Sequence, residues 1–175
     1  MDIKFCSYCA GALVESSEHG TPHQQCTLCE QQFYRNPLPC VGALLFNTRG
    51  ELLLALRKFP PAANTWDAPG GFMDLEETPE QALTREIEEE LAIHIDTWDY
   101  VGSYFDRYPF GHANYHTLNL MFSSIITDVT PKASDDISGV QWFLPDAIPY
   151  NTISFPNLAY FLRAFMAKKF TSIAT

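Results

Sequence analysis

Apolar positions along this chain fall into two patterns that predict different elements. Short apolar runs bounded by turn residues predict strands at residues 40–46, 51–57, 97–106, 115–127 and 139–143, and residues 66–72 are strand-like as well. Apolar residues spaced by three or four predict helices that begin at Pro79 and at Pro156, the second ending near Lys169. Loops are expected at residues 59–64, 107–112 and 131–136. Strands mixed with helices in this order predict an α/β fold with a mixed sheet.

The first of these helices carries its own start signals. Thr78 suits the N-cap, Pro79 the first helical position, and Gln81 the position of a capping-box partner. An apolar stripe then recurs at i, i+4 and i+8, formed by Leu83, Ile87 and Leu91. The sequence therefore predicts a helix with one face packed on a core.

Beside the apolar stripe, the same helix carries three carboxylates, Glu86, Glu89 and Glu90. Arg85 can pair with Glu89, one turn away, or reach back to Glu77. The cluster is either a solvated acidic face or a site for a hard divalent cation such as Mg²⁺, which prefers oxygen ligands. The preceding segment, residues 66–71, favours the cation site, because its two glycines let the backbone turn tightly and approach a ligand.

The stretch from Gly71 to Ile93 resembles the signature box of Nudix hydrolases, G-x5-E-x7-R-E-U-x-E-E-x-G-U, where U is a bulky aliphatic residue. The matching residues are Gly71, Glu77, Arg85, Glu86, Ile87, Glu89, Glu90 and Ile93. The chain departs from the pattern at Ala92, where the box has glycine. Because this position is near the helix end, we expect the change to affect chain reversal rather than the chemistry.

The resemblance implies a Nudix α/β/α sandwich and a pyrophosphohydrolase that cleaves a nucleoside diphosphate linked to another moiety. It implies Mg²⁺ or Mn²⁺ bound by the carboxylates of Glu86, Glu89 and Glu90, with a backbone carbonyl near Gly70. Glu77 would support this site, and Arg85 would orient the glutamates. The general base stays open between a box glutamate and a carboxylate on a later loop, where the sequence offers Asp135 and Asp136.

Two CxxC pairs near the start of the chain, Cys6/Cys9 and Cys26/Cys29, predict a structural four-cysteine Zn²⁺ site of the ribbon type. Two disulfides are the alternative; they are disfavoured because the start, MDIKFCSYC, lacks the apolar segment of a secretory signal. A histidine, His19 or His23, could also replace one cysteine. Cys40 is expected to be a buried, inert thiol. The expected domains are a zinc ribbon at residues 1–35 and a Nudix hydrolase domain at residues 36–175.

Composition and charge limit the kinds of partner that this protein is expected to bind. No apolar run approaches the roughly 20 residues that span a bilayer. The formal net charge is −10, and only Lys4 is basic among the first 34 residues, so nucleic acid is an unlikely partner on electrostatic grounds. We expect a cytoplasmic enzyme acting on a small nucleotide-derived substrate, and the resemblance adds a homodimer.

The ribbon before the box resembles the NADH pyrophosphatase group, although the SQPWW-type motif of that group is missing here. Short ribbon-plus-Nudix proteins associated with FAD or ADP-ribose hydrolysis are a closer resemblance, so ADP-ribose, FAD and NADH-like dinucleotides are the expected substrates, with release of AMP. Residues that could contact substrate are Arg57, Trp66, Tyr104, Arg107, Tyr108, Phe110 and His112; Phe105 and Tyr115 are expected to fill the core. Two further functions stay open, a binding module with a degenerate box and an RNA-cap processing enzyme.

Overall fold

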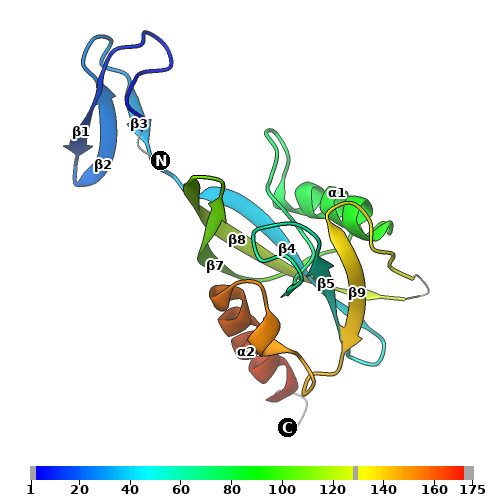
Figure 1. The fold of residues 1–175 in the computed structure, drawn as a ribbon. Helices are drawn as coiled ribbons and strands as arrows, with labels where there is room; N and C mark the ends of the chain where they lie inside the picture. Colours follow the sequence, from blue (N-terminus) through cyan, green and yellow to red (C-terminus); the bar gives the residue numbers. More distant parts are fainter. Residues whose placement is uncertain (1–2, 128–129, 172–175) are drawn as a thin grey trace.

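The computed structural model describes residues 3–127 and 130–171 and contains two sheets (Figure 1). The smaller sheet is antiparallel, with strand order β1-β2-β3, and is formed by β1 (Leu13–Glu18), β2 (Thr21–Cys26) and β3 (Gln32–Tyr34). Figure 1 shows it apart from the larger sheet and joined to it by the short segment between β3 and β4. The N-terminal part is thus a separate three-stranded unit.

The larger sheet has six strands in the order β6-β5-β4-β8-β7, with β9 paired to β5. Its strands are β4 (Leu38–Asn47), β5 (Leu52–Arg57), β6 (Trp66–Asp67), β7 (Asp99–Phe110), β8 (Ala113–Ile126) and β9 (Ile137–Phe143). Strands β4 and β8 pair in parallel and the other pairs are antiparallel, which confirms the predicted mixed sheet.

Two helices cover opposite faces of this sheet, α1 (Pro79–Leu91) and α2 (Pro156–Thr171) (Figure 1). Leu83, Ile87 and Leu91 of α1 are fully buried against one face. Leu158, Leu162 and Met166 of α2 pack in a second core on the other face, and a short 3₁₀ helix at Tyr150–Thr152 precedes α2. The expected α/β/α sandwich is confirmed.

Helix α1 begins as the sequence predicts. The Thr78 side chain accepts a hydrogen bond from the Gln81 N–H, and the Gln81 side chain accepts one from the Thr78 N–H. At the other end Ala92 adopts the left-handed conformation, with φ 53° and ψ 35°, and its N–H donates to the Glu88 carbonyl. An L-residue is strained in this conformation, and glycine, the residue of the Nudix pattern at this position, would adopt it without strain.

Replacing Ala92 by glycine is therefore expected to stabilise the protein. The left-handed conformation costs an L-residue about 1 kcal/mol, so Ala92→Gly should raise the melting temperature by about 2–4 °C in calorimetry. The matched variant Ala92→Val should lower it, because a β-branched residue fits this conformation worse. Equal melting temperatures for glycine and valine at this position would contradict the assignment of the strain to Ala92.

Several element bounds differ from the sequence-based prediction. Strand β7 continues to Phe110, so residues 107–110 are strand rather than loop; Pro109 is tolerated because β7 is an edge strand. Phe105 was expected to fill the core, and this prediction is wrong, since the side chain is 70% exposed on the edge strand. The strand expected at residues 66–72 ends at Asp67, beyond which only Phe72 forms an isolated bridge, to Cys40.

None of the helices in the described part of the chain has the length and apolar content to cross a membrane.

Candidate active site and four-cysteine cluster

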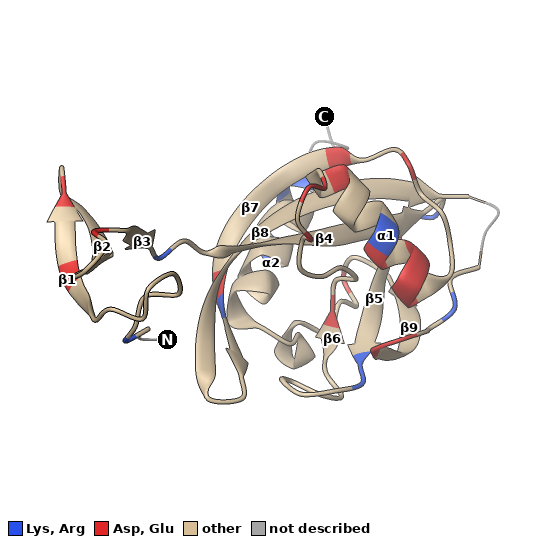
Figure 2. Cartoon of the chain, turned by 90° about the horizontal axis from the view of Figure 1, so that it is seen from above, with Lys and Arg blue, Asp and Glu red and all other residues tan. Residues whose placement is uncertain are grey.

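Arg85 holds the acidic residues around α1 in fixed positions. Its guanidinium donates to Glu77 Oε1 at 2.8 Å, Glu86 Oε1 at 2.8 Å and Glu89 Oε2 at 3.5 Å. It also donates to the Phe72 carbonyl at 3.1 Å. Figure 2 shows the basic segment of α1 beside acidic ones. Both pairings that the sequence offered to Arg85 therefore form together, and one side chain orients three carboxylates.

The glycine turn before α1 lies directly against the glutamates. The Gly70 N–H donates to Glu90 Oε2 at 2.9 Å. Gly70 has φ 138°, and a Cβ there would lie 2.2 Å from the Val41 carbonyl oxygen. A Cβ on Gly71 would lie 2.5 Å from Glu86 Oε1. Gly70 therefore requires glycine because of its φ and the Val41 backbone, whereas a Cβ on Gly71 would displace the Glu86 carboxylate.

Burial raises the proton affinity of these carboxyl groups. Glu90 is 6% exposed, and its pKa is raised to about 9, first by burial and then by the nearby Asp136. The pKa of Glu86 is also raised, mainly by burial, with Glu89 and Asp136 adding to the effect. Carboxylates that repel one another in a poorly solvated place are stabilised by a bound cation. The donor set, carboxylate oxygens beside a glycine backbone, fits Mg²⁺ or Mn²⁺.

We expect cation binding at this site to release a proton. Glu90 has a higher pKa in the folded, metal-free protein (about 9) than in the unfolded chain (4.5), so the metal-free fold loses stability as the pH rises between these values. A cation binds the ionised carboxylate, so its affinity should rise with pH toward about 9. Calorimetric titration with Mg²⁺ in two buffers of different ionisation enthalpy measures the proton release. Equal binding enthalpies in the two buffers would contradict the proton release.

A cavity of about 340 Å³ opens beside these acidic residues. Glu86, Arg85 and Asp136 line it next to the glycine turn, together with Gly70 and Gly71. Its wall and floor come from the larger sheet and from the segment before α2; these residues are Cys40, Gly42, Arg57, Asp67, Tyr104, Asp106, Arg107, Tyr108, Thr117, Asn119, Met121 and Phe155. The cavity therefore joins a carboxylate-rich end to an end with aromatic and polar side chains.

Arg57 lines this cavity, but its guanidinium is already engaged. It donates to Asp67 Oδ2 at 2.9 Å, to the Pro61 carbonyl at 2.9 Å and to the Tyr108 hydroxyl at 3.4 Å. The Tyr108 and Phe155 rings lie 6.0 and 5.5 Å from its central carbon. The geometry thus makes Arg57 a support for the cavity wall more than a free phosphate ligand.

Some of the other residues expected to contact the substrate line the cavity, and others lie outside it. Tyr104, Arg107 and Tyr108 line the cavity. Trp66 does not belong to its lining and packs edge-on against Phe143, with ring centroids 5.1 Å apart. Further residues outside the lining are Phe105, Phe110, His112 and Tyr115.

Sequence reasoning missed several polar or aromatic residues of the cavity, namely Asp67, Phe72, Asp74, Asp106, Thr117, Asn119 and Phe155. Asp106 alternates with Tyr104 and Tyr108 along β7 and shares their face of the sheet. A strand predicted through residue 110 would have placed all three in one row. Thr117 and Asn119 face Asp106 and Tyr104 across the β7–β8 pair, which no local pattern reveals.

The two acids considered for the general base are consecutive residues of the loop before β9, but their surroundings differ. Asp136 lines the cavity and acts electrostatically on Glu86 and Glu90. Asp135, with φ 48°, is not part of the lining, and its carbonyl accepts a hydrogen bond from Lys58 Nζ at 3.2 Å. Of the two, only Asp136 is brought to the candidate active site.

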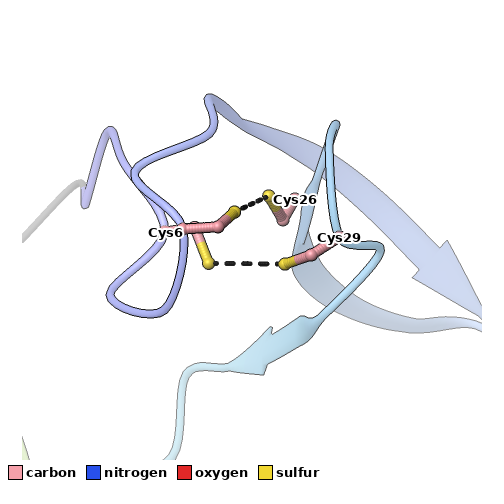
Figure 3. Close-up of side chains that lie close together, drawn as sticks. Cys6, Cys26 and Cys29 are labelled. Carbon is pink, nitrogen blue, oxygen red and sulfur yellow. Dashed lines mark hydrogen bonds between the residues drawn. The ribbon is translucent and has the colours of Figure 1, made fainter.

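The four cysteines of the two CxxC pairs converge in the small N-terminal unit (Figure 3). All four Sγ atoms lie within 4.8 Å of one another, with Cys6–Cys29 at 3.7 Å and Cys9–Cys26 at 3.4 Å. Zinc–sulfur bonds of about 2.3 Å in a tetrahedron place sulfurs about 3.8 Å apart. Separations of this size are far longer than a disulfide bond, and the cysteines are free. The geometry fits a four-thiolate Zn²⁺ site.

Backbone donors support ionised sulfur in this cluster. The Tyr8 N–H points to Cys6 Sγ and the Leu28 N–H to Cys26 Sγ, each at 3.4 Å. The pKa of Cys26 is lowered to about 6, first by the backbone N–H of Cys29 and then by that of Leu28. Among the described residues, this is the one group of His, Cys, Asp and Glu whose ligand atoms meet closely enough to hold an ion without rearrangement.

The remaining histidine and cysteine candidates lie elsewhere. His23 is 2% exposed, contacts the Thr21 carbonyl through Nδ1 and packs on the Tyr34 ring, outside the cysteine cluster. His19 is exposed beside Glu18. Cys40 is 7% exposed in the cavity lining, and burial raises the pKa of its thiol to about 12, so it is the unreactive thiol that the sequence predicts.

A protein-family model, described as "NUDIX domain", matches residues 36–165 of this chain. The chain belongs to the Nudix family. A solved structure described as a NUDIX hydrolase from Nitrosomonas europaea aligns with a TM-score of 0.74 and 27% identity, covering 97% of this chain and 93% of that one. A MutT protein from Methanosarcina mazei Go1, at 23% identity and a TM-score of 0.64, shares the fold over 77% of this chain and 96% of its own.

Curated relatives carry the name "NAD-capped RNA hydrolase NudC". The protein from Pseudomonas aeruginosa (strain LESB58) is 29% identical over 148 residues, which are 83% of this chain and 49% of the relative. The one from Haemophilus influenzae (strain PittGG) is 31% identical over 159 residues, 86% and 57% respectively. This Nudix chain spans about half the length of the curated relatives it matches.

Proposed function

We propose that this Nudix protein hydrolyses the diphosphate bond of a nucleoside diphosphate linked to another moiety. The observation that carries this proposal is the grouping of the box glutamates beside a cavity. Arg85 holds Glu77, Glu86 and Glu89, the Gly70 N–H holds Glu90, and Glu86 is the box glutamate that lines the cavity. A phosphate chain placed there meets carboxylates, so it needs a cation between them.

Glu86, Glu89 and Glu90 would hold Mg²⁺ or Mn²⁺, with the Gly70 carbonyl as a further ligand. When bound, the cation neutralises phosphate oxygens and lowers the pKa of a coordinated water. Glu77 and Arg85 act by orientation: Glu77 accepts from Arg85 at 2.8 Å and from the Asp74 N–H, which fixes the loop in front of α1.

Asp136 is the better-placed general base. It lines the cavity, and the loop that carries it is tied to α1 by the Ser134 N–H, which donates to the Glu90 carbonyl at 2.9 Å. A carboxylate so close to the glutamates can accept the proton of the attacking water at the carboxylate-rich end. A base drawn from the box glutamates is the alternative.

For the substrate we propose an AMP-containing diphosphate compound, namely ADP-ribose or one of the dinucleotides NAD(H) and FAD. The name of the relatives favours the nicotinamide dinucleotides among these. The aromatic and polar end of the cavity supports a nucleoside bound beyond the diphosphate.

The test is product analysis of purified protein with Mg²⁺ and then Mn²⁺ against NAD, NADH, ADP-ribose, FAD, diadenosine polyphosphates and nucleoside triphosphates. We expect AMP from at least one dinucleotide, and chelator should abolish the release. Silence toward the whole panel, with Mg²⁺ shown not to bind, would overturn the proposal in favour of a binding module with a degenerate box.

RNA carrying an NAD cap is the second candidate substrate, favoured by the relatives' name. The ribbon has little positive charge, since Lys4 alone is basic among residues 1–34. Our expectation that nucleic acid is an unlikely partner stays a prediction. Competition decides between the two: a capped RNA preferred over free NAD at moderate salt would make RNA the substrate.

Four properties complete the proposal. The cysteine cluster binds structural Zn²⁺, and the chain divides into a ribbon at residues 1–35 and a Nudix domain at residues 36–175. The enzyme acts in the cytoplasm as a homodimer. The homodimer rests on the resemblance to the family and the other statements on the sequence, and the four-sulfur geometry supports the first.

A further inference from the structure

Two polar atoms of the cavity wall have no hydrogen-bond partner in the described parts of the chain, the Tyr104 hydroxyl and Asn119 Oδ1. Both residues line the cavity. The enclosed side-chain atoms that lack a partner are different ones, His23 Nε2, Asp106 Oδ2 and Ser154 Oγ. Because neither the hydroxyl nor Oδ1 belongs to that enclosed set, both are accessible to a ligand in the cavity.

The two side chains are neighbours on one face of the sheet. Tyr104 of β7 pairs directly with Asn119 of β8, and residues paired in this way have Cβ atoms about 5 Å apart. No hydrogen bond joins the hydroxyl to Oδ1 among the described residues, so the hydroxyl proton and the amide oxygen are both left for a third group. A planar group lying against the pair can therefore contact a donor and an acceptor at once.

Packing fixes which atoms of these residues a ligand can use. The Tyr104 ring lies against Phe161 of α2, with ring centroids 5.3 Å apart, so one ring face is covered and the hydroxyl is the polar group that this residue offers. The Asn119 amide nitrogen donates to Thr117 Oγ1 at 3.1 Å, which orients the amide and leaves Oδ1 as the acceptor. Burial, and then nearby carboxylates, raise the pKa of Tyr104 well above its ordinary value, so the hydroxyl keeps its proton and can donate it.

A row of paired residues connects this pair to the glycine turn. Phe72, which directly follows the turn packed on the box glutamates, forms a bridge to Cys40 of β4. Cys40 in turn pairs with Asn119, the partner of Tyr104. At the usual strand spacing of about 4.8 Å, the Asn119 backbone is about 10 Å from the turn. This distance fits a base or pyridine ring that is joined through a ribose to a phosphate at the glutamates, and it is too long for the phosphate itself.

We propose that Tyr104 and Asn119 are specificity-determining residues that together bind an amide-like edge of the substrate. Asn119 Oδ1 accepts from an NH₂ group, and the Tyr104 hydroxyl donates to the carbonyl oxygen or ring nitrogen beside that group. Two groups of the proposed substrates carry this edge, adenine, whose 6-amino group lies beside ring nitrogens, and the carboxamide of nicotinamide. The inference rests on the proposed function for the identity of the substrate.

The experiment measures the binding of two pairs of mononucleotides by calorimetry in Mg²⁺. AMP is compared with IMP, which has a carbonyl oxygen in place of the amino group. Nicotinamide mononucleotide is compared with 3-acetylpyridine mononucleotide, which keeps the carbonyl and lacks the N–H donors. The variants are Tyr104→Phe, which keeps the ring, and Asn119→Ala. Their matched controls are Tyr100→Phe and Asn114→Ala, exposed residues of the same types on β7 and β8 outside the cavity lining.

We expect wild type and both controls to bind the NH₂-bearing member of at least one pair more tightly, by roughly 3- to 10-fold, because the other member leaves Asn119 Oδ1 without a donor. Asn119→Ala should lose this preference. Tyr104→Phe should weaken binding of the preferred nucleotide by a similar factor. A preference within the purine pair assigns the contact to adenine, and a preference within the pyridine pair assigns it to nicotinamide.

Equal affinities within both pairs in wild type, or binding of none of the four nucleotides, would overturn the inference. The same holds if Asn119→Ala keeps the preference, or if Tyr104→Phe binds the preferred nucleotide as tightly as wild type. Hydrolysis of a dinucleotide without any such preference would leave the proposed reaction standing. A preference that depends on both residues, without hydrolysis of any dinucleotide, would overturn the reaction and leave the recognition by Tyr104 and Asn119 standing.

Discussion

Replacing Glu90 by glutamine is expected to lower kcat for diphosphate hydrolysis by about 10³-fold and leave the fold intact. Glu90 is almost fully buried, and burial and Asp136 raise its pKa to about 9, so the metal-free protein already carries a neutral side chain there at pH 7. Glutamine has the same shape and can still accept the Gly70 hydrogen bond. Only the negative charge that a cation requires is lost. Steady-state kinetics with saturating Mg²⁺, together with calorimetric melting, measure both effects.

Two further variants sharpen this test. Glu89→Gln should also lower kcat by orders of magnitude, since Glu89 shares Arg85 with Glu86 and belongs to the same proposed ligand set. Glu88→Gln is the matched control, because Glu88 is exposed on the same helix and contacts His94 instead. Full activity in both Glu89→Gln and Glu90→Gln would contradict the metal site, and so would a Glu88→Gln variant as inactive as they are.

Cys26→Ser is expected to remove the bound zinc and unfold the N-terminal unit without melting the Nudix domain. Cys26 is 2% exposed at the centre of the cysteine cluster. Neither hydrophobic core cluster contains a residue before Val41, so no apolar core holds residues 3–35 together. A structural zinc supplies on the order of 10 kcal/mol in units of this kind. The Nudix core keeps all of its buried residues in the variant.

Zinc content by elemental analysis and amide dispersion in NMR spectra are the two measurements. We expect one zinc per chain in wild type and none in Cys26→Ser, with collapsed dispersion confined to the ribbon signals. Cys40→Ala is the control, since that thiol lies in the cavity lining and should leave the zinc in place. A ribbon that keeps its dispersion after losing its zinc would refute the structural role of the metal.

Local sequence patterns were enough to predict the features that lie within a single helix or turn. Helix α1 forms because its cap, its first proline and its apolar stripe are all within a few turns of chain. The CxxC pairs each bring two sulfurs together by their own turn, and the hydrogen-bonded β1–β2 pair lies between the two turns. These features depend on neighbours in sequence, so periodicity and spacing contain the information that specifies them.

Strand ends and side-chain faces were harder to predict for a reason visible in β7. Pro109 and Gly111 are typical of loops, yet the pairing with β8 continues to Phe110 because an edge strand tolerates proline. One residue of error in a strand reverses which side chains are inside. Phe105 therefore turned out exposed, while its neighbours Tyr104 and Asp106 face the cavity.

The sequence by itself determined the family, the helix that carries the glutamates and the set of four cysteines, because each is encoded within a short stretch of chain. Tertiary structure alone decided how the cavity is lined. It engaged Arg57 with Asp67, placed Asp136 and not Asp135 beside Glu90, and set Tyr104 opposite Asn119 in the cavity wall. Each of these depends on which strands and loops become neighbours when the sheet forms, and long-range pairing leaves no periodic signal in the chain.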